Sequence, residues 1–316
     1  MTGILRRMPR RSAPAKPPAD TQPMRVCAAW GRRFLLRDES DSQTRPQART
    51  RGKRLRPVCG DEVFAQPLAG ESDWVIEQIG VRRNELSRPD LRGRREVLAA
   101  NIDTVVVVVC ETPSPDWFIV DRYLAAARQM QCDAILVWNK RDLASPDAEL
   151  STFESIGYRV ISTSKDDATT VIPLTDALAG QRSIFVGQSG VGKSSLINAL
   201  GAEQQQRTAT ISDANAEGRH TTVAATLLYL DHAIEVIDSP GVRDYAPSIE
   251  SLVDVDQGFV ENDALAASCR FGNCMHRAEP GCAVKEALAD ETLSERRYQS
   301  YLRLVNLTRQ LRADKY

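Results

Sequence analysis

One stretch of nine residues has the residue types and spacing needed to bind the phosphates of a nucleotide. It consists of Gly187, Gln188, Ser189, Gly190, Val191, Gly192, Lys193, Ser194 and Ser195, and it fits the pattern G-x-x-x-x-G-K-[ST]. Glycines let backbone N–H groups turn toward phosphate oxygens, and the helix that follows adds the positive end of its dipole. We expect Lys193 to reach the β- and γ-phosphates and the Ser194 hydroxyl to ligate Mg²⁺. The sequence therefore predicts a nucleotide site that uses magnesium.

A second polar stretch indicates which base this site selects. The sequence N-K-R-D at 139–142 follows an apolar run and matches the N-K-x-D pattern of GTPases. The Asp142 carboxylate can accept hydrogen bonds from the N1–H and the 2-amino group of guanine, whereas adenine offers neither there. Asn139 would contact the base edge, and the Lys140 stem would pack along the ring. Ser162, or one of the two residues after it, could supply a backbone contact to guanine O6.

Two further segments are expected on the γ-phosphate side. The sequence D-S-P-G at 238–241 matches D-x-x-G, so Asp238 would hold Mg²⁺ through water and the Gly241 N–H would contact the γ-phosphate. A loop between the phosphate loop and this motif carries Thr221 and Thr222, either of which could complete the magnesium shell. The expected magnesium ligands are Ser194, Thr222 and Asp238, with Thr221 as the alternative to Thr222.

The residue that would activate water is less obvious. Ras-like GTPases place a water-orienting Gln just after D-x-x-G, but this chain has Val242 there. An apolar side chain cannot orient water, so we expect slow intrinsic hydrolysis. His220 is the candidate catalytic residue, because an imidazole facing the γ-phosphate could position the attacking water. The alternative is that His220 is an exposed, inert loop residue.

The order of these motifs is unusual. Alternating strand-like and helix-like segments over residues 102–237 predict a doubly wound parallel sheet. In ordinary GTPases the phosphate loop precedes N-K-x-D, whereas here N-K-R-D precedes the phosphate loop by about fifty residues. The same sheet can form if the chain is circularly permuted, because strand adjacency does not depend on where the termini fall. The segment after Gly241 would then lead directly into the C-terminal region.

A cluster of metal-binding residue types follows in that region. Cys269, Cys274, His276 and Cys282 form a Cys₃His set, which is typical of a closed tetrahedral structural zinc site. Helices are expected over 283–288 and 293–311. The second of these helices is rich in arginine, and its basic face is either an RNA contact or a solvated surface.

The N-terminal part has a different pattern. Residues 1–22 are rich in Arg and Pro, which predicts disorder. Strand-like pieces between residues 24 and 86 suggest a small β-barrel, either of the OB type or SH3-like. The basic run Arg45–Arg56 is interpreted as one of its loops, which is either solvated or in contact with a polyanion, and residues 87–95 as a linker. Basic loops on such a barrel would suit RNA.

Composition limits the class of protein. The chain of 316 residues has a net charge of −1, and 42% of its residues are hydrophobic, as expected for a globular protein. Its apolar runs are too short to span a bilayer, and the N-terminus lacks an apolar signal segment. We therefore expect a cytoplasmic monomer without membrane contact. The remaining cysteines should be reduced core residues, namely Cys27, Cys59, Cys110 and Cys132.

The motifs together resemble one family. N-K-R-D at 139–142, G-Q-S-G-V-G-K-S-S-L-I-N at 187–198, G-R-H-T-T at 218–222, D-S-P-G and the Cys₃His set are similar to those of the RsgA family of circularly permuted GTPases for small ribosomal subunit biogenesis. The stretches 99–103, 121–124 and 279–285 agree as well. The resemblance covers nearly the whole chain from about residue 24.

This resemblance implies an α/β circularly permuted P-loop GTPase domain, with an N-terminal OB-type β-barrel and a C-terminal helical zinc-binding module. The expected boundaries are 1–22 for the basic tail, 23–88 for the OB-fold RNA-binding domain, 89–246 for the GTPase domain and 247–316 for the zinc-binding domain.

The resemblance also implies a function. Such a protein would bind the small ribosomal subunit and its rRNA late in maturation and hydrolyse GTP to GDP and phosphate with ribosome-stimulated turnover and release from rRNA. Its cofactors would be one structural Zn²⁺ and Mg²⁺ with GTP. An alternative is a GTP-gated RNA-binding assembly chaperone with negligible hydrolysis, with which Val242 is compatible. A GTP-dependent metallochaperone is a further alternative, which the closed Cys₃His set argues against.

Overall fold

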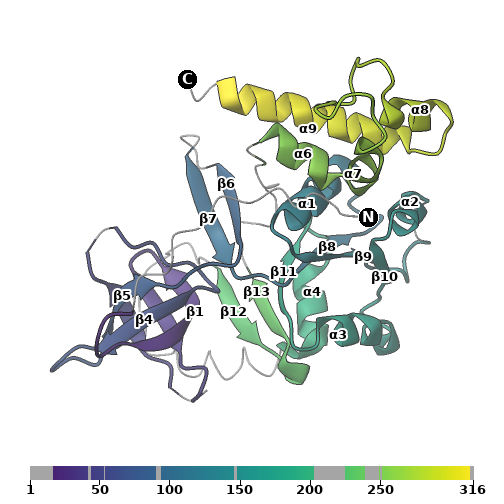
Figure 1. Cartoon of the computed structure of the whole chain (residues 1–316). Helices are drawn as coiled ribbons and strands as arrows, with labels where there is room; N and C mark the ends of the chain where they lie inside the picture. Colours follow the sequence, from purple (N-terminus) through teal and green to yellow (C-terminus); the bar gives the residue numbers. More distant parts are fainter. Residues whose placement is uncertain are drawn as a thin grey trace.

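The computed structural model describes most of the chain. The described residues are 17–41, 44–52, 54–89, 94–145, 148–202, 225–238, 249 and 251–313. Within them, a small barrel, a mostly parallel sheet with helices on both faces, and a group of C-terminal helices follow one another along the sequence (Figure 1). Residues 1–16 of the predicted disordered tail lie outside these ranges, whereas residue 22 at its end already belongs to the first strand.

Five short strands close the N-terminal barrel. They are β1 (Gln22–Trp30), β2 (Arg33–Arg37), β3 (Gln47–Thr50), β4 (Glu62–Pro67) and β5 (Trp74–Ile79). Their order is β1-β2-β3-β5-β4, and β4 pairs back with β1, while β3 and β5 run parallel. Alternate residues point inward, so that Val26, Phe34 and Ile76 are among the residues of a closed apolar core. This closure and strand order belong to the OB type rather than the SH3-like alternative.

Two sequence predictions in this region are wrong. The basic run Arg45–Arg56 is not all loop, because Gln47–Thr50 forms strand β3 and its Ala48 is buried in the barrel core. Residues 87–95 are not a simple linker, since β6 (Glu85–Pro89) and β7 (Arg95–Ala100) form a hairpin. Arginines can occupy this hairpin because they form ion pairs across the two strands, as Arg88 does with Glu96.

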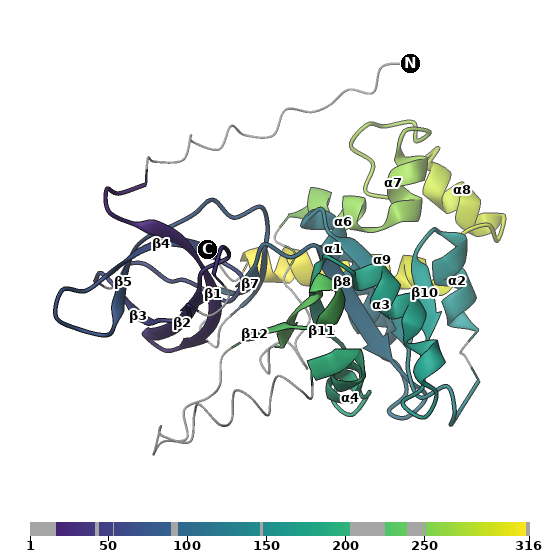
Figure 2. The ribbon, with the colours of Figure 1, turned by 90° about the horizontal axis from the view of Figure 1, so that it is seen from below.

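A six-stranded sheet forms the centre of the molecule. Its order is β10-β9-β8-β11-β13-β12, and all of these strands are parallel except β12. The strands are β8 (Thr104–Val109), β9 (Asp133–Trp138), β10 (Arg159–Ser162), β11 (Arg182–Val186), β12 (Thr226–Tyr229) and β13 (Glu235–Asp238). Strand β12 also pairs with β1, so the barrel and this sheet are continuous (Figure 2).

The central strand β8 shows how helices cover both faces. Its six residues are all buried, as expected for a parallel strand between two helical layers. Val105 and Val107 belong to the same apolar cluster as Tyr123 of α1 (Trp117–Gln129) and Phe153 of α2 (Glu149–Ser155). The alternate residues Val106 and Val108 pack with the helices of the other face, α3 (Ile172–Leu178) and α4 (Lys193–Ile197).

The C-terminal helices pack on the outer side of α1 (Figure 1). They are α6 (Leu252–Gly258), α7 (Val260–Ala266), α8 (Ala283–Ala289) and α9 (Glu295–Ala313). Ala125 of α1 shares an apolar cluster with Phe259 and Tyr301. Gly258 lies so close that an added Cβ would stand 2.7 Å from the Ala125 Cβ. The sequence pattern did not predict four of these elements, namely α2, β12, α6 and α7.

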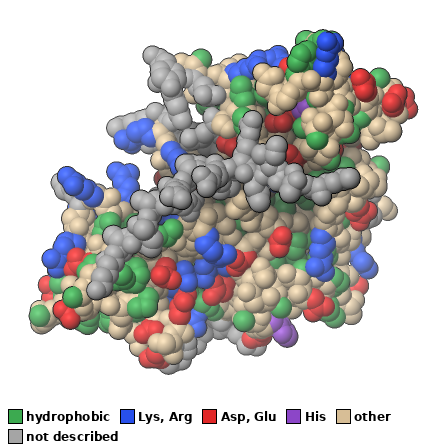
Figure 3. All heavy atoms as spheres, viewed as in Figure 1, with side chains coloured by type: hydrophobic (Ala, Val, Ile, Leu, Met, Phe, Trp, Pro, Cys, Tyr) green, Lys and Arg blue, Asp and Glu red, His purple; other side chains and the backbone are tan. Residues whose placement is uncertain are grey.

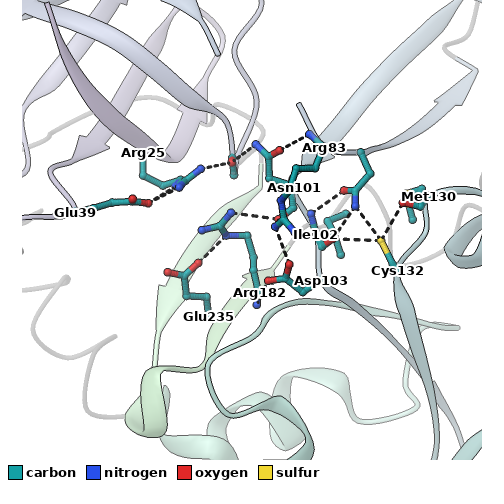
Figure 4. A network of polar contacts seen from close by, with 12 residues as sticks. Arg25, Glu39, Arg83, Asn101, Ile102, Asp103, Met130, Cys132, Arg182 and Glu235 are labelled. Atoms are coloured by element: carbon teal, nitrogen blue, oxygen red, sulfur yellow. Dashed lines mark hydrogen bonds and ion pairs between the residues drawn. The ribbon is translucent and has the colours of Figure 1, made fainter. Parts of the chain in front are cut away.

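A polar network joins the barrel to the sheet (Figure 4). The Asn101 amide donates a hydrogen bond of 3.0 Å to the Gly60 carbonyl, and Arg182 contacts Glu235 at 2.6 Å. Arg25, which is 9% exposed, bonds the same Gly60 carbonyl at 3.2 Å. Because these groups are buried and paired, they fix the barrel against one end of the sheet.

Among the described helices, none combines the length and apolar character that crossing a bilayer would require.

Candidate nucleotide site and metal centre

The predicted nucleotide motifs meet at one edge of the sheet. Strands β8, β9, β10, β11 and β13 run parallel, so their carboxyl ends lie along the same side. N-K-R-D follows β9, the phosphate loop follows β11, and Asp238 is the last residue of β13. Ligands of open α/β sheets bind in the crevice beyond these strand ends. The circular permutation is therefore compatible with the usual spatial arrangement.

Two glycines of the phosphate loop stand where no side chain would fit. Gly187 has φ 133°, and a Cβ there would lie 2.2 Å from the Val108 carbonyl oxygen. Gly192 has φ 94°, and its Cβ would lie 2.4 Å from the amide nitrogen of Asn139. Both are left-handed conformations that favour glycine. The loop thus packs directly against β8 on one side and against N-K-R-D on the other.

Lys193 lies within the curve of this loop. The side chain is 7% exposed, and Nζ donates hydrogen bonds of 2.6 Å to the carbonyls of Gly187 and Gln188. Ser194 and Ser195 follow in the first turn of α4 and line the adjoining cavity. A lysine in this position can exchange its carbonyl contacts for phosphate oxygens, which bind an ammonium group more strongly.

Asn139 and Lys140 tie the two motifs together. The Asn139 side chain donates to the Val191 carbonyl at 2.9 Å and accepts from the Thr163 hydroxyl at 3.0 Å. Lys140 Nζ donates to the carbonyls of Thr112 and Gly190, at 2.9 and 2.7 Å. These contacts hold the phosphate loop and the base-recognition loop at a fixed separation.

Asp142 presents its carboxylate to the same space. The Ser164 hydroxyl donates a hydrogen bond of 2.5 Å to Asp142 Oδ1. This bond stabilises the charged form and lowers the pKa of Asp142. The carboxylate is thus ionised at neutral pH and able to accept hydrogen bonds from a guanine edge.

A cavity of about 570 Å³ lies between these groups. Its volume is in the range of sites for small organic ligands. The cavity is lined by Asn139, Lys140, Asp142, Leu143, Lys165, Asp166, Ser189, Gly190, Gly192, Lys193, Ser194 and Ser195.

Some predicted residues are placed elsewhere. Ser162 lies within β10, in register with Trp138, and does not line the cavity. Val191 is fully buried in the core. Gln188 turns aside, and its side-chain oxygen accepts a hydrogen bond of 3.0 Å from the Asp116 N–H. His220, Thr221, Thr222 and Gly241 lie outside the described residues.

The sequence pattern overlooked several cavity residues, namely Leu143, Lys165 and Asp166. Each follows the end of a sheet strand within a few positions. Their position after strand ends could have identified them as site residues, because loops after parallel strands converge on the same crevice.

The Cys₃His set converges as the spacing predicts. Donor atoms of Cys269, Cys274, His276 and Cys282 all lie within 4.8 Å of one another. The His276 Nδ1 atom faces the sulfurs, 3.3 Å from Cys282 Sγ, while Nε2 lies 3.0 Å from an Asp256 oxygen. A carboxylate behind a histidine commonly orients the ring for metal binding. This donor set and its orientation fit a structural zinc ion.

Helix α9 supports the loop that carries these ligands. The Tyr298 hydroxyl donates to the His276 carbonyl at 2.8 Å, and the Tyr301 hydroxyl donates to the Met275 carbonyl at 2.9 Å. Both tyrosines are buried. The metal loop is therefore anchored to the helix that also packs on α1.

Comparison with known proteins agrees with this arrangement. A sequence model of the family described as RsgA GTPase matches residues 79–247. The crystal structure of YjeQ from Thermotoga maritima is 28% identical, with a TM-score of 0.71 over 91% of this chain and 98% of that one. The crystal structure of YloQ, described as a circularly permuted GTPase, is 26% identical, with a TM-score of 0.69 over 92% and 96% of the two chains. The matched family model, these structures and the permuted order of motifs around one cavity show that this chain belongs to the RsgA family of GTPases.

Proposed function

We propose that this protein binds the small ribosomal subunit and assists its late maturation, hydrolysing GTP to GDP and phosphate as it does so. The observation that carries the proposal is the single cavity in which a phosphate loop faces an ionised Asp142. Contact with the subunit would stimulate hydrolysis, and hydrolysis would release the protein from rRNA. The proposed domains are an OB-fold RNA-binding domain at 23–88, a GTPase domain at 89–246 and a zinc-binding domain at 247–316.

The described residues suggest how the nucleotide is held. Lys193 and the N–H groups of the phosphate loop would bind the β- and γ-phosphates, while Asp142 pairs with the guanine edge. Ser194, Asp238 and either Thr222 or Thr221 would hold Mg²⁺, which neutralises charge on the phosphates. Asn139 and Lys140 bond carbonyls of the phosphate loop and would hold that loop beside the bound base.

Hydrolysis requires an oriented water. Val242 stands where Ras-like GTPases have a glutamine, and an apolar side chain cannot position water. We propose that His220 positions this water when the protein is bound to the small subunit. With this assignment, turnover of the free protein would be slow and turnover on the ribosome would be faster.

A chain of contacts supports communication between the phosphate loop and the C-terminal helices. Gln188 of the loop accepts a hydrogen bond from Asp116, whose carboxylate caps the first turn of α1. Five residues further along α1, buried Asp121 pairs with Arg297 of α9. Helix α1 therefore begins beside the phosphate loop and contacts the C-terminal helices, and we propose that it couples the two regions.

A second candidate function remains because of Val242. In this alternative the protein is a GTP-gated RNA-binding assembly chaperone with negligible hydrolysis. Both candidates use the nucleotide cavity, and they differ in whether GTP is consumed.

Co-sedimentation with purified ribosomal subunits tests the proposed partner. The full-length protein should pellet with small subunits when loaded with a non-hydrolysable GTP analogue, and much less when loaded with GDP. Large subunits serve as the control. Equal pelleting with both subunits, or none with small subunits in either nucleotide state, would contradict the proposal.

A further inference from the structure

Helices α1 and α9 form the two sides of a surface groove outside the nucleotide site and the metal centre. The groove has a volume of about 620 Å³. Its lining residues include Phe118 and Arg122 from α1, and Gln299, Arg303, Asn306 and Gln310 from α9. None of the known roles of the nucleotide motifs or of the Cys₃His set uses these residues.

One arginine in the groove is already stacked on an aromatic ring. The Arg303 guanidinium carbon lies 4.0 Å from the centre of the Phe118 ring, and Arg122 lies 5.8 Å from the same ring. A guanidinium that lies over a ring on one side can stack on another planar group with its opposite face. Nucleobases stack on guanidinium planes and aromatic rings in RNA recognition.

Carboxamide side chains extend along the same groove. Gln299, Asn306 and Gln310 are exposed and, with Arg303, are spaced three or four residues apart, so they share one face of α9. The stripe from 299 to 310 is about 16 Å long at 1.5 Å per residue. Carboxamides offer both donors and acceptors, which base edges require.

The charge of the groove favours a polyanion. It contains two arginines, and no carboxylate is among the described residues that line it. Glu295 lies just beyond one end, where it accepts a hydrogen bond from Gln299. Figure 3 shows basic side chains along the upper edge of the molecule, where α9 lies.

We propose that the groove between α1 and α9 binds a single-stranded segment of RNA, with Arg303 stacked between Phe118 and a base. In a duplex the base edges are occupied by base pairing, whereas unpaired bases can enter a groove of this size and bond the carboxamides. This proposal deepens the proposed function, because it rests on RNA being the partner.

A buried ion pair ties together the two helices that form the groove. Arg297, the neighbour of Arg296 on α9, pairs with Asp121 of α1 at 2.6 Å, and both side chains are 1% exposed. This buried pair fixes the separation of the two helices. Preorganisation lowers the entropic cost of binding. The first residues of α1 contact the phosphate loop through the Asp116–Gln188 hydrogen bond. An RNA strand in the groove would therefore contact the same helix that adjoins the nucleotide site.

Photo-crosslinking locates the bound strand. The full-length protein would be irradiated with a 4-thiouridine-containing single-stranded RNA of mixed sequence, and crosslinked peptides identified by mass spectrometry. Crosslinks are expected in α1 near Phe118 and in α9 between 299 and 310. An unlabelled single strand should compete better than an unlabelled duplex of the same length.

Matched variants separate stacking from general charge attraction. Arg303→Ala should lower crosslinking at the groove about fivefold or more, as loss of a stacked base does in other single-strand binding proteins. Arg309→Ala removes the same charge from an exposed position on the same helix, outside the groove, and should change it less than twofold. Asn306→Leu with Gln310→Leu removes two of the three carboxamides while leaving Phe118 and Arg303 unchanged, and should also weaken crosslinking.

Two results would overturn this inference: no crosslinks in these helices, or equal losses for the Arg303 and Arg309 variants. Circular dichroism melting of each variant shows whether the fold is retained. The small-subunit co-sedimentation of the unaltered protein is measured in parallel. A protein that pellets with small subunits but does not crosslink at the groove refutes only the groove, whereas failure to pellet refutes the proposed function.

Discussion

Arg297 holds the C-terminal helices to α1, and its removal should be strongly destabilising. Its guanidinium lies 2.6 Å from Asp121 Oδ1 and contacts both oxygens of Glu261, at 2.6 and 2.8 Å. The side chains of Arg297 and Asp121 are 1% exposed, and that of Glu261 is 8% exposed. In Arg297→Met, Asp121 would keep its contact with Arg296, but Glu261 would lose both hydrogen bonds while remaining buried.

Removing one partner of a buried ion pair typically costs about 3–5 kcal/mol, because it leaves an uncompensated charge. We therefore expect Arg297→Met to lower the free energy of unfolding by about that amount, measured by urea denaturation followed by circular dichroism. Arg309→Met, at an exposed position on the same helix, should change it by less than about 0.5 kcal/mol. The double variant Arg297→Met with Glu261→Met should recover part of the loss, because no buried carboxylate is left without its partner at that position.

If Arg297→Met lowered the free energy of unfolding by less than about 1 kcal/mol, this explanation would be wrong, since water or neighbouring groups would then neutralise or solvate the carboxylates. Equal losses for the single and double variants would also count against it, because the cost would then arise from packing rather than charge.

Three further predictions concern the nucleotide site and the metal centre. Asp142→Asn should weaken GDP binding about 100-fold or more, because the amide N–H would face the 2-amino group of guanine, which is also a donor. The same variant should bind xanthosine diphosphate better, since xanthine has an acceptor oxygen at that position. Fluorescent nucleotide titration measures both affinities. Gly192→Ala should abolish nucleotide binding in the same titration, because its Cβ would lie 2.4 Å from the Asn139 amide; retained binding would contradict the close packing of the two loops. Cys282→Ser should reduce bound zinc from one ion per chain and lower the melting temperature, as measured by elemental analysis and circular dichroism; unchanged zinc content would argue against this ligand.

Local motifs made much of the nucleotide site predictable. The phosphate loop and N-K-R-D each carry their chemistry within a few neighbouring residues, and both follow apolar strands, so their convergence could be inferred from topology. The Cys₃His set is equally local. Its carboxylate partner Asp256 was not predicted, because it belongs to α6 and only the fold brings it beside His276.

Other features depend on contacts between distant parts of the chain. Strand β3 falls within a basic run, and its burial depends on pairing with β2 and β5 rather than on its own hydrophobicity. The Arg297–Asp121 pair joins residues 176 positions apart. Arginines on a helix usually indicate a solvated face, so the sequence alone could not distinguish Arg297 from its exposed neighbour Arg303.

The most direct test of the central claim is the rate of GTP hydrolysis by the purified protein, alone and with purified small subunits, with large subunits as control. We expect slow hydrolysis by the protein alone and at least a tenfold increase with small subunits only, a change in barrier of about 1.4 kcal/mol. His220→Ala should lose the increase while still binding GTP. No increase with small subunits would contradict a ribosome-stimulated GTPase and favour the GTP-gated RNA-binding alternative.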